Sequence, residues 1–115
     1  MNRLATNAIG IEQGETLLFS DYQSGGKMWT GSGEREIRKR VQFSEQYRSA
    51  PSVMAHLTMW DLDNEANLRA AVKAESVDRE AFDIVFRTWG DTKIARIRVG
   101  WMAIGETGFD DDWAV

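Results

Sequence analysis

Hydrophobic and polar residues alternate along most of this chain with a period of two, the pattern of half-buried β-strands. Short polar connections interrupt the alternation at residues 61–66, 78–80 and 90–93. Six strands are therefore predicted, at residues 8–19, 37–43, 51–60, 68–75, 82–89 and 94–104. This spacing predicts an all-β domain, a six-stranded antiparallel β-sandwich.

The phase of the alternation assigns a buried face to each strand, and a shift of one residue would exchange the two faces. Trp101 shares its phase with the apolar residues of its strand and is predicted to lie in the core. Trp60 and Trp89 fall on the opposite phase at strand ends, which favours an external partner. Ile94 shares the outer phase of the arginines that follow it. Residues 66–74 have helical propensity, but their period of two favours a strand.

Residues 20–34 form a loop rich in glycine and serine, for which neither helix nor strand is predicted. The glycine spacing does not match a phosphate-binding loop. Two interpretations stay open: a connection whose glycines adopt positive φ, or a ligand-lining loop that carries Trp29, Ser32 and Glu34.

Composition excludes several classes of protein. The chain has no Cys and a net charge of −4, so neither a disulfide, a thiolate metal site nor a nucleic-acid partner is expected. No apolar run approaches the roughly 20 residues that a membrane helix needs, so no membrane insertion is expected. The first 13 residues lack the apolar stretch of a signal peptide. A soluble protein is predicted, cytoplasmic or else exported or virion-associated by a non-classical route.

Catalytic and metal-binding chemistry find little support. His56 is the only histidine, and no base, nucleophile and orienting group can be combined from one His and no Cys, so no enzyme is predicted. Asp61, Asp63 and Glu65 resemble the front of a calcium loop but lack its glycine and its distal glutamate. A solvated turn is the favoured interpretation, and no metal or cofactor is expected.

Basic residues gather in the second predicted strand and on the outer phases of later strands. For the first group we expect a solvated edge or ion pairs between subunits rather than a phosphate site. For the second group, solvation and pairing with carboxylates of a neighbouring subunit both stay open. The first group comprises Arg35, Arg38, Lys39 and Arg40, and the second Arg69, Lys73, Arg87, Arg96 and Arg98.

Arg69 and Trp89 carry the main functional hypothesis. They stand near the start of one predicted strand and at the end of the next, so both are expected on a rigid sheet. A guanidinium can donate two hydrogen bonds to vicinal hydroxyls, and an indole can cover the apolar face of a sugar ring. The pattern alone indicates an exposed polar and aromatic edge, and a saccharide is the ligand that suits it.

Several short motifs are informative in combination: Val41-Gln-Phe, Pro51, Thr58-Met-Trp-Asp-Leu-Asp, Asn67-Leu-Arg, Ala81-Phe, Thr88-Trp-Gly-Asp-Thr-Lys and Val99-Gly-Trp-Met-Ala-Ile. Together they resemble the H-type lectin domain family over about residues 9–106. The resemblance implies a domain at residues 9–106, between an N-terminal lead of residues 1–8 and an acidic, aromatic tail of residues 107–115. The resemblance implies a six-stranded antiparallel sandwich that assembles as a trimer. It also implies metal-independent carbohydrate binding at clefts between adjacent subunits, with Arg69 and Trp89 in the site.

Two positions depart from the family pattern. Gly90 stands where the family has a His directly after the Trp, and Gly33 and Glu34 stand nearest to an Asp in the loop before the second strand. Glu34 and Asp91 are the candidate acceptors in their place. The candidate carbohydrate-binding residues are therefore Arg69, Trp89, Gly90, Asp91, Gly33 and Glu34. Galactose or N-acetylgalactosamine is one possible ligand type, and a different saccharide is the other.

Two functions follow as hypotheses. The first is a homotrimeric or hexameric lectin whose several weak sites act together in the recognition of glycans or cell surfaces. The second is a trimerising structural or adhesion module, for instance in a phage tail or surface assembly, without sugar binding. Phe109 and Trp113 in the tail suggest either a disordered end or a peptide that docks on a partner.

Overall fold

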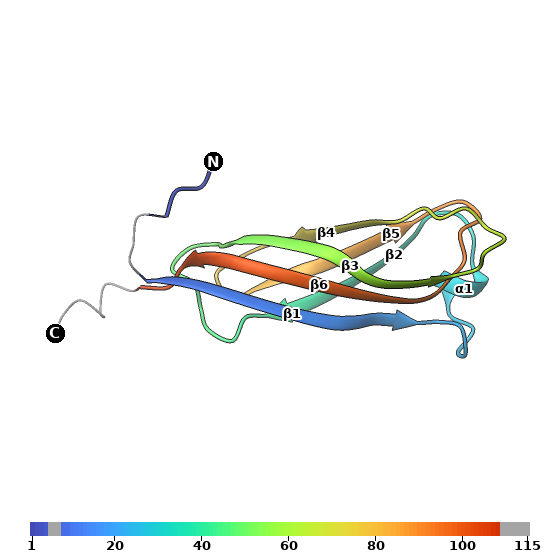
Figure 1. Ribbon diagram of the computed structural model, residues 1–115, viewed down its shortest axis with the longest axis horizontal. Helices are drawn as coiled ribbons and strands as arrows, with labels where there is room; N and C mark the ends of the chain where they lie inside the picture. The colour runs from blue at the N-terminus through green and yellow to red at the C-terminus, as the bar shows by residue number, and fades with distance from the viewer. Residues whose placement is uncertain (5–7, 109–115) are drawn as a thin grey trace.

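The computed structural model describes residues 1–4 and 8–108 and is a sandwich of two antiparallel sheets (Figure 1). Its strands are β1 (Ile9–Ser20), β2 (Arg35–Gln42), β3 (Ser52–Leu62), β4 (Ala71–Glu75), β5 (Ala81–Thr88) and β6 (Ile94–Glu106). One sheet has the order β1–β6–β3 and the other the order β2–β5–β4. The predicted all-β, six-stranded antiparallel sandwich is confirmed.

The core lies between the two sheets and is built largely on their central strands, β5 and β6. Phe82 and Phe86 of β5 and Val99 of β6 are fully buried. Trp101 is also buried, and its ring meets that of Phe82 edge-on with 5.2 Å between the centroids. Side chains at alternate positions thus fill the core, and the prediction for Trp101 is confirmed.

Three local predictions are wrong. The strand expected to start at residue 68 starts at Ala71, because the carbonyls of Asn67 and Arg69 accept hydrogen bonds from threonine hydroxyls instead of a strand neighbour. Ile94 is fully buried, because the pairing of β3 with β6 slips between Asp61 and Leu62. The loop of residues 20–34 contains a short helix, α1 (Lys27–Thr30).

The outer faces of the two sheets differ in character. On the β1–β6–β3 sheet, a set of apolar side chains lies in the half remote from α1, and several of them are exposed to solvent. We call this set the apolar face; it comprises Ile9, Ile11, Met54, Met102 and Ile104. On the β2–β5–β4 sheet, charged side chains cross from strand to strand. We call that set the ion-paired face; it comprises Glu36, Arg38, Arg40, Glu75, Asp83 and Arg87.

Three of the basic residues considered in the sequence, Arg38, Arg40 and Arg87, form ion pairs on the ion-paired face. Arg38 Nη1 lies 2.8 Å from Asp83 Oδ2, and Arg40 Nη1 lies 3.2 Å from Asp83 Oδ1. Arg87 lies between Glu36 and Glu75, at 2.8 and 3.2 Å. These arginines pair with carboxylates of their own chain, so the pattern does not require a neighbouring subunit.

The ends of the chain are described only in part. Residues 5–7 of the predicted lead and residues 109–115 of the predicted tail lie outside the described residues, and so do Phe109 and Trp113. No helix within the described residues is long and apolar enough to span a membrane.

Candidate functional site

The turn between β5 and β6 brings three of the predicted residues together. The guanidinium of Arg69 forms an ion pair with the carboxylate of Asp91 and donates a further hydrogen bond to Thr92 Oγ1 at 3.4 Å. Gly90 lies directly beneath this guanidinium and has φ +70°. A Cβ atom at position 90 would lie 3.0 Å from Arg69 Nη1. Glycine therefore serves both the turn conformation and the close approach of Arg69.

Hydrogen bonds to Thr88 and Thr92 fix the segment that carries Arg69. The hydroxyl of Thr88 donates to the carbonyl of Arg69, and that of Thr92 donates to the carbonyl of Asn67. Both threonines are buried. Arg69 is thus held by side chains just before β4 and not by a sheet ladder, so its expected place on a rigid strand is wrong.

The pKa of the Asp91 carboxyl is lowered, first because Arg69 donates a hydrogen bond to its charged form. The hydrogen bonds of Arg69 within the described residues all use Nη1, so Nε and Nη2 stay available as donors. The pair therefore offers a carboxylate acceptor and guanidinium donors side by side, the combination that neighbouring hydroxyls require.

Arg35 joins the loop of Gly33 to this turn. Its side chain is only 7% exposed, and it donates to the carbonyls of Gly33 at 3.0 Å, Met28 at 3.2 Å and Gly90 at 3.2 Å. The amide of Gly33 also donates to the carbonyl of Gly90 at 2.9 Å. Arg35 is thus a positioning residue. Its phase, shared with the inward Ile37, is the signal in the sequence that could have shown this.

Trp89 and Glu34 line a different surface, a groove of about 550 Å³ that opens on the ion-paired face. Glu36, Ala71 and Arg87 line it as well. The Trp89 side chain is 43% exposed. A volume of this size lies in the range of small-molecule sites.

The predicted residues therefore meet at one end of the sandwich but in two groups. Arg69, Gly90 and Asp91 form one group, whereas Trp89 and Glu34 form the other. Arg69 does not line the groove of Trp89, although the residues adjoin at Gly90. Within one chain, Arg69 and the groove of Trp89 are therefore adjacent but separate parts of the predicted site.

Other residues considered in the sequence have local roles. Asp61 pairs with Arg96, and Asp63 Oδ1 accepts a hydrogen bond from the amide of Glu65 at 2.9 Å. Within residues 1–4 and 8–108, no group of three His, Asp or Glu side chains is placed to hold a metal ion. Trp29 and Ser32 do not line the groove of Trp89.

Solved structures show the same sandwich in discoidins. The recombinant discoidin II of Dictyostelium discoideum superposes with a TM-score of 0.76 at 20% identity, over 94% of this chain and 41% of that chain. At this identity the likeness shows the fold. In sequence, a Discoidin-1 polypeptide of the same organism is 31% identical over 96 residues, which are 81% of this chain and 38% of that protein. The chain spans about two fifths of these relatives.

The H-type lectin domain matches residues 38–104, and the chain belongs to this family. A protein of Fuscovulum blasticum is 47% identical over 108 residues, which are 94% of each chain. It is described as "ATP synthase subunits region ORF 7", words that state no ligand. The chain is thus a lectin-like domain, as its motifs predicted.

Proposed function

We propose that this chain is a carbohydrate-binding module whose sites form, without metal, in clefts between the subunits of a homotrimer or hexamer. It has no catalytic activity in this account. The observation that carries the proposal is the Arg69–Asp91 pair, which lies over Gly90, one residue from the exposed ring of Trp89. Guanidinium donors, a carboxylate acceptor and an indole surface thereby adjoin at one turn.

The apolar face supports the assembly. Ile11 is 62% exposed and Met54 is 56% exposed, on neighbouring parts of one sheet. A soluble monomer rarely leaves a contiguous apolar surface in water, and association with copies of the chain would cover it. Within one chain, Arg69 does not line the groove of Trp89. In the proposed assembly, an adjacent subunit therefore completes the cleft.

Assembly also supplies affinity. Sugar sites that bind weakly one at a time gain roughly 10²–10⁴ in avidity when several engage one surface. Glu34 and Asp91 supply acceptors in place of the family's Asp and His. Because these acceptors stand at other positions, we expect the preferred saccharide to differ from N-acetylgalactosamine or galactose, or to include them only weakly.

A structural or adhesion module is the second candidate. The observation that favours it is the Arg69–Asp91 ion pair itself, which already satisfies part of the guanidinium inside the chain. In this case the apolar face would still assemble the subunits, and no saccharide would bind.

A glycan array probed with the wild-type oligomer separates the two candidates. We expect selective binding that Arg69→Ala lowers by at least about tenfold, since a charge-assisted hydrogen bond is lost. Arg40→Ala is the matched control, because Arg40 also pairs with carboxylates but lies on the ion-paired face away from the turn. EDTA should leave the binding unchanged. Binding to no glycan, or equal loss in both variants, would contradict the lectin proposal.

A further inference from the structure

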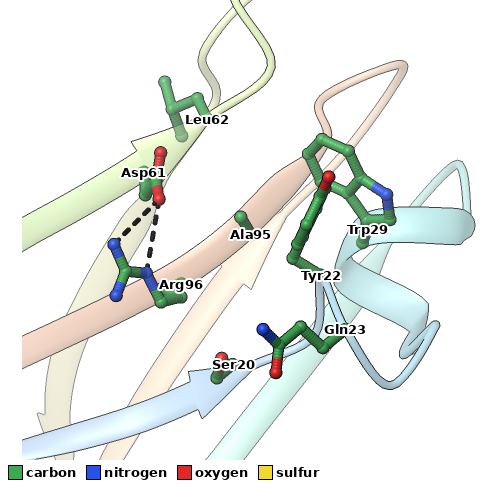
Figure 2. Close-up of a pocket in the computed structure, with 8 residues that line it drawn as sticks. All are labelled: Ser20, Tyr22, Gln23, Trp29, Asp61, Leu62, Ala95 and Arg96. Carbon is green, nitrogen blue, oxygen red and sulfur yellow. Dashed lines mark hydrogen bonds and ion pairs between the residues drawn. The ribbon is translucent and has the colours of Figure 1, made fainter.

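A second cavity lies at the same end of the sandwich but on the other sheet. It measures about 460 Å³ and opens where β1 ends, β3 ends and β6 begins. Figure 2 shows Tyr22 and Trp29 on one side and Asp61 and Arg96 on the other, with Ala95 between them. None of its lining residues lines the groove of Trp89.

The aromatic side of this cavity is held in place from below. The rings of Tyr22 and Trp29 meet edge-on with 5.0 Å between the centroids. The Asp21 amide donates to the Ala95 carbonyl at 2.7 Å, and Asp21 Oδ2 accepts from the amide of Met28 at 3.0 Å. Met28 is fully buried. The backbone on both sides of the aromatic pair is therefore fixed to β6 and to the core.

Gly26 makes this arrangement possible. A Cβ atom there would lie 2.3 Å from Asp21 Cγ, so only glycine allows Asp21 to reach α1. Arg35 holds the far side of α1 by donating to the carbonyl of Met28. A surface loop fixed by this many contacts loses little conformational freedom when a ligand binds.

The polar side of the cavity has hydrogen-bonding groups that no other described residue uses. Arg96 donates from Nε at 3.3 Å and from Nη2 at 3.1 Å, and both bonds go to the same oxygen, Asp61 Oδ2. Within the described residues, Arg96 Nη1 and Asp61 Oδ1 have no partner in the chain. The Gln23 amide adds both a donor and an acceptor at the rim.

An aromatic surface opposite paired donors and acceptors suits a polyhydroxylated ring. The hydroxyls of a sugar require donor and acceptor groups together, and the apolar C–H face of its ring packs on an aromatic side chain. A bare anion would meet the Asp61 carboxylate, and a bare cation would meet Arg96. A neutral saccharide meets neither repulsion.

We propose that the cavity of Tyr22, Trp29, Asp61 and Arg96 is a second saccharide site, separate from the Arg69–Trp89 region. This inference rests on the proposed function for its class of ligand, but not for its residues. Each subunit then presents two sugar contacts at one end of the sandwich, which would favour branched or extended glycans over single sugars.

The indole N–H signals in a ¹H–¹⁵N correlation spectrum can test this, since the full chain has five tryptophans. Trp29→Phe and Trp89→Phe assign the two signals. The titrants are the methyl glycosides of galactose, N-acetylgalactosamine, glucose and mannose. We expect at least one of them to shift the Trp29 signal saturably, and to do so in Arg69→Ala as well.

Arg96→Gln should weaken the Trp29 response about tenfold, because it removes charged hydrogen bonds. Arg98→Gln is the matched control, because Arg98 lies on the same strand and pairs with Glu15 at 3.3 Å but does not line the cavity. A Trp29 signal that stays still while the Trp89 signal saturates would refute the second site and leave the proposed function standing. Equal weakening in both Arg variants would also refute it. If neither signal responds to any glycoside, both proposals fail.

Discussion

The two outer faces of this sandwich differ in how far their outward-pointing apolar side chains are shielded from water. Val85 points outward from β5 on the ion-paired face, yet it is fully buried between its strand neighbours Arg38 and Lys73, whose side chains are long enough to cover it. Ile11 points outward from β1 on the apolar face and is 62% exposed. The outward Val85 is buried within a single chain, whereas the apolar face leaves side chains exposed, and the proposed assembly would cover them.

The residues proposed for assembly and those proposed for sugar binding also lie in different parts of the sandwich. The apolar face lies in the half of its sheet remote from α1, whereas the cavity of Tyr22 and Trp29 lies at the α1 end. The β5–β6 turn, which contains Gly90, also lies at that end (Figure 1). In the proposed assembly, contact between subunits must therefore extend from the apolar face toward the α1 end, where an adjacent subunit completes the cleft. In this account assembly sets the number of sites, and the turn sets their chemistry.

The largest expected effect is on assembly. Ile11→Glu would place like charges from several subunits in one interface, so we expect the dissociation constant of the oligomer to rise at least about a hundredfold. Sedimentation velocity would measure it. Gln42→Glu adds the same charge to the outer side of β2 and should leave the oligomer intact. An Ile11→Glu chain that still assembles like wild type would remove the apolar face from the account.

The next prediction compares the stability lost when the buried Val85 and the exposed Ile11 are each shortened to alanine. Val85→Ala removes two buried methyl groups and should lower the free energy of unfolding by about 2 kcal/mol. Ile11→Ala should change it by less than about 0.5 kcal/mol, since the side chain is exposed in the monomer. Urea unfolding must be done at concentrations where both chains are monomeric, because association adds stability. Equal losses would mean that the faces do not differ.

Two glycines near the end of the ion-paired face test whether the position of Arg69 matters for glycan binding. Gly90 and Gly33 have φ +70° and +75°, so alanine is strained at both positions, by about 1–2 kcal/mol. A Cβ atom at Gly33 has nothing within 4 Å, whereas one at Gly90 meets Arg69. Gly90→Ala should therefore reduce glycan binding severalfold, while Gly33→Ala should lower thermal stability and reduce glycan binding less. Similar binding by both variants would show that the position of Arg69 does not matter.

The smallest effect is a dependence of stability on pH. The pKa of Asp83 is lowered from 3.8, first because Arg38 donates a hydrogen bond to its carboxylate. Its stabilisation is therefore present above pH 3.8 and is lost as the pH falls through the lower folded-state value. Asp83→Asn should lower Tm at pH 7 and reduce the fall in Tm between pH 5 and pH 3. Asp91→Asn should have smaller effects on Tm and on its fall between pH 5 and pH 3, because Arg69 is the one charged group that pairs with Asp91 within the described residues. Parallel Tm curves for Asp83→Asn and wild type would contradict this role of the ion-paired face.

The alternation of side chains was enough to predict six strands and their buried faces, because burial of one face imposes a period of two. The alternation gave wrong predictions where contacts other than regular strand pairing determine burial or a strand boundary. Ile94 is buried because the β3–β6 pairing slips, and β4 begins late because Thr88 and Thr92 capture backbone carbonyls. Such long-range contacts leave no periodic trace in the sequence.

The proximity of Arg69, Gly90 and Asp91 could be predicted from the sequence, but the grouping of the other candidate residues could not. Arg69, Gly90 and Asp91 do meet, since the β5–β6 turn passes the start of β4. The positive φ of Gly90, however, turns the chain between Trp89 and Asp91, so the indole and the guanidinium serve different surfaces. The sequence predicted a solvated edge or an ion pair between subunits for Arg35, but this residue is buried and joins the loop to the turn.

Sedimentation equilibrium of the wild-type chain over a wide range of concentrations tests the central claim most directly, that one face is complete and the other is an interface between copies. The account predicts a species of three chain masses, or six, that persists on dilution. A monomer at every concentration would contradict it, because the apolar face would then stand in water with no copy of the chain to cover it.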